Sequence, residues 1–490
     1  MQDQLTVKTT YGIIRGEEER GVCVWRGIPY AQAPMGALRF HHSRPPQPWT
    51  GVRETVCFGK TAPQKERRAE EYSEDCLFLN IWSPAADGKK RPVLFYIHGG
   101  SFAAGAGSDP EYNGVNLVHA GDCVVVTVNY RLGVLGFLDF SELGEEFEAN
   151  CGLSDILSAL AWCHDNIARF GGDPENITVF GQSAGAICIS ALITMKSAQP
   201  YIAKAIMMSS GPTLFVNHEE AVQLARQFME YSGLRTKEAL MSAPAELLVE
   251  KQKTFTSYCG LGSGTFTIEI DGKLVEKFPI PAVKNGIDKK IPILMGTTRE
   301  EMSFLFIKPV AKALEIDGIM NAGVSKEPEE IRTGIPPLYD RYGKRGRSMM
   351  MADLVFRLAS AWFAESASPH TKTWMYSFDY ETPAMRVSGL HAFHSSDIPF
   401  VFGNFKAGMA KLIFLFSPSK KGPREISRQM QQDFIRFAKT GELPWQPCRG
   451  ADTPAKCYNK KITYRQIIES DIKEAYLRSE FRRRSFEEEC

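Results

Sequence analysis

The sequence has almost no net charge and no long hydrophobic run. Its 490 residues carry 58 Lys and Arg against 57 Asp and Glu, which leaves a formal net charge of +1. Proteins that neutralise many phosphates usually have a marked basic excess, so nucleic acid is not expected as a partner. The best apolar run, residues 124–140, is broken by Asn129 and Arg131 and is shorter than the roughly 18 residues of a membrane span, so no membrane association is expected.

A signal peptide and a paired set of cysteines are also lacking. Residues 1–7 have neither a basic segment nor an apolar core, so they do not have the pattern of a secretory leader. The eleven cysteines are odd in number, and several lie within apolar stretches. These features predict a cytoplasmic protein with reduced, buried thiols, with a Cys57–Cys76 bridge as the main alternative.

Short, continuously apolar segments alternate with helical patterns along most of the chain. Such strands are typical of a parallel sheet that is covered by helices on both faces and joined by right-handed crossovers. The predicted strands are residues 93–97, 124–128, 177–180, 203–208, 291–295 and 373–378, and the clearest helices are 153–168 and 184–195. Before them, residues 5–15 and 22–28 predict a small antiparallel sheet.

Two helix-rich stretches are too long for simple connections between strands. Residues 212–290 and 303–372 are therefore expected to form insertions that act as cap or regulatory regions. The chain is expected to end in a charged helix over residues 470–489. Its run of three arginines, residues 482–484, is interpreted as a solvated helix face.

A glycine-flanked serine carries the sharpest chemical signal. Gly181-Gln182-Ser183-Ala184-Gly185 follows the strand predicted at 177–180 and precedes the helix predicted at 184–195. The bare G-x-S-x-G pattern is weak, but a strand–turn–helix elbow is the context that makes the serine a nucleophile. The helix N-terminus there favours developing negative charge. A glycine turn with a capping serine is the alternative, and the flanking segments favour the nucleophile.

A nucleophilic serine needs a base, and the base needs an orienting acid that precedes it in the chain. The turn after residues 291–295 offers Glu300 and Glu301. His370 lies before the last predicted strand, whereas active groups collect at the carboxyl ends of strands. His391 and His394 both follow that strand, so the residues alone leave two acids and two bases open.

Acyl transfer also needs N–H groups that donate hydrogen bonds to the negatively charged oxygen of the transition state. The residue after the nucleophile, Ala184, is expected to supply one of them. The turn His98-Gly99-Gly100-Ser101-Phe102 follows the strand predicted at 93–97 and is expected to supply the others, because its glycines let the backbone approach a substrate.

At this point the chain resembles the type-B carboxylesterases, the family that includes bacterial para-nitrobenzyl esterases and animal cholinesterases. The resemblance covers nearly the whole length. It is carried by residues 25–31 (WRGIPYA), 73–80 (SEDCLFLN), 98–102, 129–137 (NYRLGVLGF), 181–185, 296–301 and 394–403. It implies an α/β-hydrolase fold: one domain over 1–490 with a central, mostly parallel sheet flanked by helices, a small N-terminal antiparallel sheet and helical cap insertions.

The resemblance also implies the roles of individual residues. The implied triad is Ser183, Glu301 and His394; the implied oxyanion donors are Gly100, Ser101 and Ala184; the implied supports of Glu301 are Ser210 and Asp397. The sequence departs from the family pattern at Ser101, which is usually Gly or Ala, at Met302, usually Gly, and at Asp397, commonly Glu. The resemblance further suggests that Arg39 pairs with Glu74.

The expected function is a serine carboxylesterase that hydrolyses neutral, short-to-medium esters through an acyl-enzyme, with no metal or cofactor. Small-molecule esters are the expected partners, and the oligomeric state is left open. Trp25 and Phe102 are expected to form apolar walls, with Arg299 as the main nearby cation. The alternatives are an amide, carbamate or lactone as the physiological substrate and, more remotely, a binding protein without activity.

Overall fold

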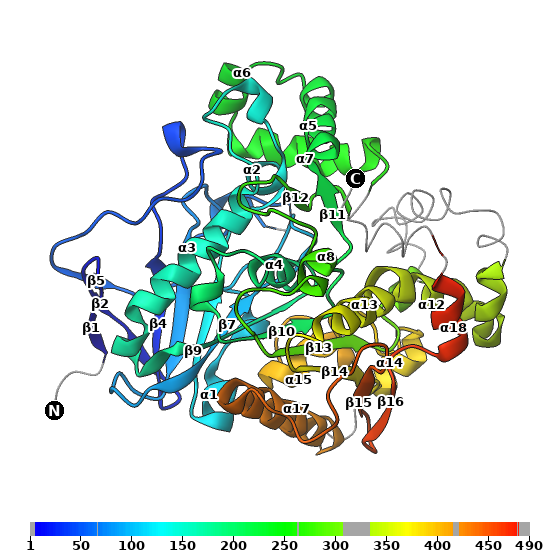
Figure 1. Cartoon of the computed structure of the whole chain (residues 1–490). Helices are drawn as coiled ribbons and strands as arrows, with labels where there is room; N and C mark the ends of the chain where they lie inside the picture. The colour runs from blue at the N-terminus through cyan, green and yellow to red at the C-terminus, as the bar shows by residue number, and fades with distance from the viewer. Residues whose placement is uncertain are drawn as a thin grey trace.

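An eleven-stranded sheet runs through the molecule (Figure 1). The computed structural model describes residues 5–65, 67–261, 264–306, 334–414, 421–477 and 479. The strands are β3 (Glu17–Glu19), β4 (Val22–Pro29), β6 (Phe78–Ser83), β7 (Arg91–Ile97), β8 (Val124–Val128), β9 (Gly172–Gln182), β10 (Lys204–Met208), β13 (Ile293–Thr298), β14 (Thr373–Phe378), β15 (Pro454–Tyr458) and β16 (Thr463–Gln466). Their order is β16-β15-β14-β13-β10-β9-β7-β8-β6-β4-β3. The run from β15 to β8 is parallel, and both flanks are antiparallel.

Helices cover both faces of this sheet, as the continuously apolar strands predict. Along β7, Phe95 and Ile97 belong to one apolar core, whereas Leu94 and Tyr96 belong to a second core on the other face. The first core includes helices α3 (Cys151–Asn166), α4 (Ala184–Leu192), α8 (Pro279–Lys284) and α13 (Leu358–Ala367). The second includes α1 (Val115–Gly121), α15 (Ile398–Phe402) and α17 (Lys421–Thr440), along the lower side of Figure 1.

The N-terminal region differs from the expectation in one respect. The small sheet consists of β1 (Thr6–Lys8), β2 (Ile13–Arg15) and β5 (Val52–Glu54), with β1 antiparallel and β5 parallel to β2. Residues 22–28, expected in that sheet, instead form most of β4 and pair with β6 in the main sheet. The reason is burial on both faces, since Val24 and Trp25 point to opposite cores and are both fully buried.

The first insertion is a helical unit beside a two-stranded parallel sheet, at the top of Figure 1. It contains β11 (Phe215–Asn217), α5 (His218–Ser232), α6 (Lys237–Ser242), α7 (Ala245–Tyr258) and β12 (Ile268–Ile270), and it ends with α8. The capping box at Asn217 and Glu220 starts α5. A cap or regulatory role for this unit stays a prediction.

The second insertion is described only in part. Its described elements are η8 (Ser303–Phe306), η9 (Pro336–Arg345), α12 (Gly346–Ala352), η10 (Asp353–Arg357) and α13. Helix α13 packs on β13 and β14, so the end of this insertion covers the sheet. The last described helix, α18, covers Ser470–Tyr476, and most of the remainder predicted to 489, including the three arginines at 482–484, lies outside the described residues.

The predicted pair between Arg39 and Glu74 is confirmed. Arg39 Nε donates to Glu74 Oε2 at 2.8 Å, and both side chains are at least nine-tenths buried. The Nη1 group of Arg39 also donates to the backbone carbonyls of Leu240, Met241 and Ala243, at 2.7–3.0 Å. The arginine thus joins the N-terminal region to the end of α6.

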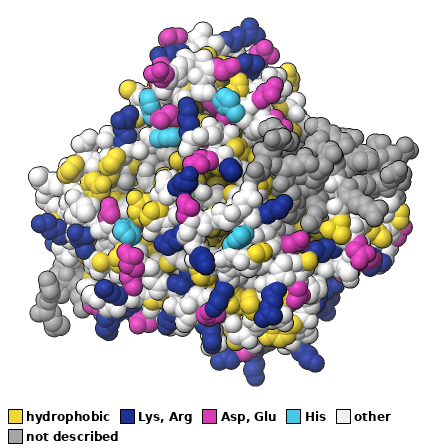
Figure 2. Space-filling model, viewed as in Figure 1, with side chains coloured by type: hydrophobic (Ala, Val, Ile, Leu, Met, Phe, Trp, Pro, Cys, Tyr) yellow, Lys and Arg dark blue, Asp and Glu magenta, His cyan; other side chains and the backbone are white. Residues whose placement is uncertain are grey.

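The surface and the cysteines agree with parts of the prediction. On the face shown in Figure 2, basic and acidic side chains are interspersed, which fits the balanced charge. Of the helices that the structure describes, none is long and apolar enough to cross a membrane. Ten cysteines are described as free thiols, and these include the exposed Cys57 and the buried Cys76. Residence in the cytoplasm stays a prediction.

Candidate active site

Ser183 occupies the tight turn between β9 and α4. Its backbone has φ +56° and ψ −125°, a strained conformation for a residue with a side chain. The turn is held because Ser183 N–H donates to the Met208 carbonyl at 2.9 Å. A Cβ atom at Gly181 or Gly185 would lie 2.8 or 2.1 Å from the carbonyl oxygen of Ile97, so only glycine fits beside β7 at these positions. The close approach of two backbones explains the spacing of the glycines.

Glu301 and His394 lie side by side at the carboxyl end of the neighbouring strands. His394 Nδ1 is 2.6 Å from Glu301 Oε2. The other carboxylate oxygen, Oε1, accepts hydrogen bonds from Ser209 Oγ and from the Thr298 N–H, each at 2.7 Å. The Glu301 side chain is fully buried, and its oxygens are nevertheless all hydrogen-bonded. Its position is therefore well determined, and it orients the imidazole.

The imidazole of His394 is the part of this pair that reaches the surface. Its side chain is 17% exposed, and the ring stacks on Phe356 with centroids 4.6 Å apart. With Nδ1–H donated to Glu301, Nε2 is an acceptor, and the Gln182 amide nitrogen lies 3.0 Å from it. Among the described contacts there is no hydrogen bond between Ser183 and His394. The serine directly follows Gln182, so it belongs to the same turn that the imidazole faces.

The two competing candidates have other partners. His391 Nδ1 lies 3.0 Å from Glu381 Oε1, and Glu300 Oε1 accepts from Arg345 at 2.5 Å. The structure thus brings together Glu301 and His394 and keeps Glu300 and His391 apart from that pair.

The glycine turn after β7 lies against the elbow. A Cβ at Gly99 would come within 3.1 Å of Ser183 Cβ, and one at Gly100, which has φ +118°, would lie 2.1 Å from the Ala104 carbonyl oxygen. Ser101 continues the turn with φ +53°. Within the described part of the chain, the N–H groups of Gly100, Ser101 and Ala184 have no hydrogen-bond acceptor. They are available to a ligand.

His98 stabilises this turn but is not a further base. It is fully buried, its ring stacks on Tyr130 at 4.4 Å, and its Nδ1 lies 2.8 Å from the Gly99 carbonyl oxygen. Burial lowers the pKa of His98 to about 4, so the imidazole stays neutral.

The supports of Glu301 are partly different from those expected. Ser209, not Ser210, donates to Glu301; the Ser210 hydroxyl has no hydrogen-bond partner among the described residues. Ser209 has φ +50° and its N–H bonds to the Gly296 carbonyl, which turns its side chain toward β13. Asp397 accepts from the Tyr376 hydroxyl at 2.9 Å. Burial and the nearby charge of Glu301 raise the pKa of Asp397 to about 7, so this carboxyl holds its proton more tightly than an exposed one does.

Two residues expected around the site have other roles. Trp25 is fully buried in β4, packs against Phe170 with ring centroids 4.9 Å apart, and does not form a wall of the site. The Arg299 guanidinium lies 3.6 Å from the Asp379 carboxylate, which offsets its charge. Sequence reasoning missed Ser209, Gln182 and Phe356. Of these three, only Gln182 could have been found from the sequence, because it lies within the G-x-S-x-G pattern of the elbow.

Comparison with known proteins shows the family to which the chain belongs. Residues 3–488 match the model of the carboxylesterase family. The chain is 34% identical to the para-nitrobenzyl esterase of Bacillus subtilis (strain 168), with 95% of each protein covered, and 32% identical to the phenmedipham hydrolase of Pseudarthrobacter oxydans, with 91% and 93% covered. A crystal structure of a Geobacillus stearothermophilus carboxylesterase superposes with a TM-score of 0.85 at 36% identity, over 96% of this chain and all of that one.

The chain belongs to the carboxylesterase family and has the α/β-hydrolase fold. It is a carboxylic ester hydrolase.

Proposed function

We propose that the protein hydrolyses esters through a Ser183–His394–Glu301 triad and an acyl-enzyme. The observation that carries this proposal is the 2.6 Å contact between the buried Glu301 and His394, whose Nε2 faces the elbow that holds Ser183. The Gln182 amide nitrogen lies 3.0 Å from Nε2, and Ser183 is the next residue of the same turn. Catalytic hydrogen bonds often tighten only when substrate binds, so the Ser183–His394 contact is expected in the substrate complex.

The reaction proceeds in two half-reactions. His394 Nε2 takes the proton of Ser183 Oγ while Oγ bonds to the ester carbonyl carbon. The tetrahedral intermediate then breaks its bond to the alcohol oxygen, which leaves with the proton from His394. Water attacks the acyl-enzyme in the same way, giving up a proton to His394, and the free carboxylic acid departs as Ser183 regains its proton. Glu301 stays ionised and stabilises the imidazolium in both steps.

The negative charge of each intermediate is held by backbone N–H groups. Gly100, Ser101 and Ala184 are proposed as donors, supported by their unpaired N–H groups and by the closeness of Gly99 to Ser183 Cβ. Such donors are oriented before the reaction starts, and each typically lowers the activation free energy by about 3 kcal/mol.

The preferred substrates are neutral, short-to-medium esters with a fairly bulky alcohol. Support comes from charge: Glu301 and Asp397 lie behind the histidine, and the nearby cations Arg299 and Arg345 each pair with a carboxylate. An anionic ester would be repelled by the Glu301 carboxylate, and the described cations Arg299 and Arg345 already pair with other carboxylates. The apolar face of Phe356 against the imidazole also suits a neutral group.

The test is the substitution Ser183→Ala, with Ser190→Ala as the matched control. Ser190 is a buried serine on the same helix whose hydroxyl donates to the Ile187 carbonyl. With 4-nitrophenyl acetate and butyrate, kcat for Ser183→Ala should fall by about 10⁴-fold or more, whereas Ser190→Ala should stay within about threefold. Residual activity above a few per cent in a folded Ser183→Ala protein would contradict the proposal.

The substrate class is tested with a panel of acyl lengths, amides, carbamates and lactones at equal conditions. The proposal expects the highest kcat/KM on neutral esters of short or medium acyl chains. A maximum beyond about ten acyl carbons would indicate a lipase-like tunnel instead. A higher kcat/KM on an amide, carbamate or lactone would be compatible with the proposed triad but would contradict the proposed substrate class.

A further inference from the structure

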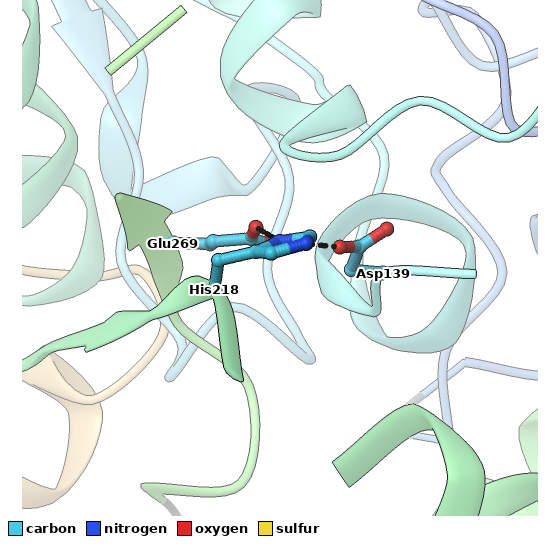
Figure 3. Close-up of side chains that lie close together, drawn as sticks. All are labelled: Asp139, His218 and Glu269. Atoms are coloured by element: carbon cyan, nitrogen blue, oxygen red, sulfur yellow. Dashed lines mark hydrogen bonds and ion pairs between the residues drawn. The ribbon is translucent and has the colours of Figure 1, made fainter. Parts of the chain in front are cut away.

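A second group of titratable side chains lies away from the elbow, where the first insertion meets the core (Figure 3). Asp139 comes from the core, between α2 (Gly133–Phe137) and η4 (Ser141–Leu143). His218 is the first residue of α5, and Glu269 lies in β12. The imidazole of His218 lies between the two carboxylates, with one contact to each.

The ligand atoms converge on one point. His218 Nδ1 is 2.6 Å from Glu269 Oε1 and 3.2 Å from Asp139 Oδ2. One nitrogen and two carboxylate oxygens all lie within 4.8 Å of one another. Imidazole and carboxylate together are the ligands that Zn²⁺ and similar divalent transition metals accept.

The carboxylates are buried without a fixed cation. The side chains of Asp139 and Glu269 are 1% and 4% exposed. Within the described ranges, neither forms an ion pair with a lysine or an arginine. Asp139 Oδ2 has no hydrogen-bond partner, although it faces His218.

Neighbouring groups hold the two carboxylates in place. The Ser141 N–H donates to Asp139 Oδ1 at 2.8 Å, which leaves Oδ2 directed at His218. The Asn150 side chain accepts from the Glu269 N–H at 3.0 Å and donates to its carbonyl at 2.9 Å. The backbone of Glu269 is thereby fixed to the start of α3. Such supporting contacts are typical of metal ligands that keep their geometry before the ion arrives.

We propose that Asp139 Oδ2, Glu269 Oε1 and His218 Nδ1 bind one divalent transition-metal ion, with Zn²⁺ as the probe. The ion would join the first insertion to the core, separately from ester hydrolysis. Ligands about 2.1 Å from a tetrahedral ion lie about 3.4 Å apart, so the contact with Asp139 fits as it stands and the contact with Glu269 must widen. His218 can make that adjustment because its side chain is 61% exposed, and its open side leaves room for water as a fourth ligand.

A similar group near the elbow lacks these features. Glu300, Glu381 and His391 also bring three ligand atoms together, but Arg345 pairs with Glu300 and Arg386 pairs with Glu381. Their charge is already offset by fixed cations. The proposal is therefore restricted to the group at the insertion.

The experiment titrates ZnCl₂ into full-length protein freed of metal by chelation, and follows heat of binding and thermal unfolding. Wild type should bind one more Zn²⁺ than His218→Gln, and saturating Zn²⁺ should raise its Tm by about 2 °C or more. In His218→Gln the affinity of this site should fall at least about tenfold and the rise in Tm should disappear. Because His218 is largely exposed, this variant is expected to fold.

Two further variants complete the test. Asp139→Asn, checked for folding by circular dichroism, should also lose the site. The matched control is His164→Gln, because His164 likewise lies between two carboxylates, Asp165 and Glu175, but both of these are exposed. The control should bind Zn²⁺ as wild type does. Identical isotherms for wild type and His218→Gln, or loss of the site in His164→Gln alone, would overturn the proposal.

Discussion

Two histidines in this protein each contact a buried glutamate at 2.6 Å, yet their surroundings give them different chemistry. Glu301 receives two hydrogen bonds on its second oxygen, and His394 is 17% exposed and stacked on Phe356. At the insertion, His218 is 61% exposed and contacts a second buried carboxylate, Asp139.

The contrast shows that a histidine–carboxylate contact does not by itself define a catalytic pair. At the elbow, one carboxylate orients the imidazole and leaves Nε2 as an acceptor that faces the Ser183 turn, as the proposed proton transfer requires. At the insertion, the two carboxylates converge on the same nitrogen, and the proposed metal ion would offset their charge. The groups around each ring are therefore the basis of the two different proposals.

The largest expected effect comes from removing the imidazole at the elbow. His394→Ala should lower kcat by about 10⁵- to 10⁶-fold, because both half-reactions lose their base and acid. The matched control is His391→Ala, whose histidine pairs with Glu381 and should leave kcat within about threefold. Steady-state kinetics with 4-nitrophenyl butyrate measures both. A larger loss of kcat in His391→Ala than in His394→Ala would show that His394 is not the base.

The orienting carboxylate is expected to come next. Glu301→Gln should lower kcat by about 10⁴-fold, since an amide cannot stabilise the imidazolium and can favour the wrong tautomer. Glu300→Gln serves as the control, because Glu300 pairs with Arg345 and should change kcat only slightly. Rates of the two variants measured under identical conditions decide between the acids. Equal losses of kcat in the two variants would contradict the assignment of Glu301 as the orienting acid.

A smaller effect is expected from the hydroxyl that supports Glu301. Ser209→Ala removes one hydrogen bond to a charged, buried group, typically about 1.5–3 kcal/mol, so kcat should fall about tenfold with little change in KM. Ser210→Ala should stay within about twofold, because the Ser210 hydroxyl has no described partner. If the Ser210 variant is the weaker enzyme, the structural assignment of the support is wrong.

The smallest effect on turnover is expected at Asp397, where stability is the better measurement. Its pKa is raised from 3.8 to about 7, so the folded state binds this proton more tightly than the unfolded state. Stability that depends on this proton is therefore lost as pH rises from about 4 to about 7, by up to about 4 kcal/mol. Asp397→Asn should melt several degrees above wild type at pH 8 and close to it at pH 5. A difference in Tm that does not change between these pH values would contradict the assignment.

Much of the fold was predictable because the relevant signals are local. The buried strands of the parallel sheet are short apolar segments, and all six predicted strands are present, although β9 begins five residues before its predicted start at 177. The sequence did not predict strands β3, β5, β6, β11, β12, β15 and β16, and β4 was assigned to the wrong sheet. Strand partners lie far apart in the sequence, so a local pattern does not specify which sheet a strand joins.

The candidate site likewise has features that the sequence predicted and features that it left open. The elbow was predictable since Gly181 and Gly185 are required by the approach of β7, a constraint that leaves a visible spacing in the sequence. Residue patterns alone left Glu300 and Glu301 open, and the family resemblance implied Ser210 where the structure has Ser209. Adjacent residues in a turn can face opposite directions, and the direction depends on backbone angles such as φ +50° at Ser209.

By itself, the sequence determined six strands of the parallel sheet, the turn that carries Ser183 and the absence of a charge excess. Each of these depends on neighbouring residues or on composition. Only the tertiary structure decided that His394 contacts Glu301 while His218 contacts both Glu269 and Asp139, because each histidine lies 51 or more residues from its glutamate in the sequence. Contacts over such separations arise from the packing of whole elements, which a linear pattern does not record.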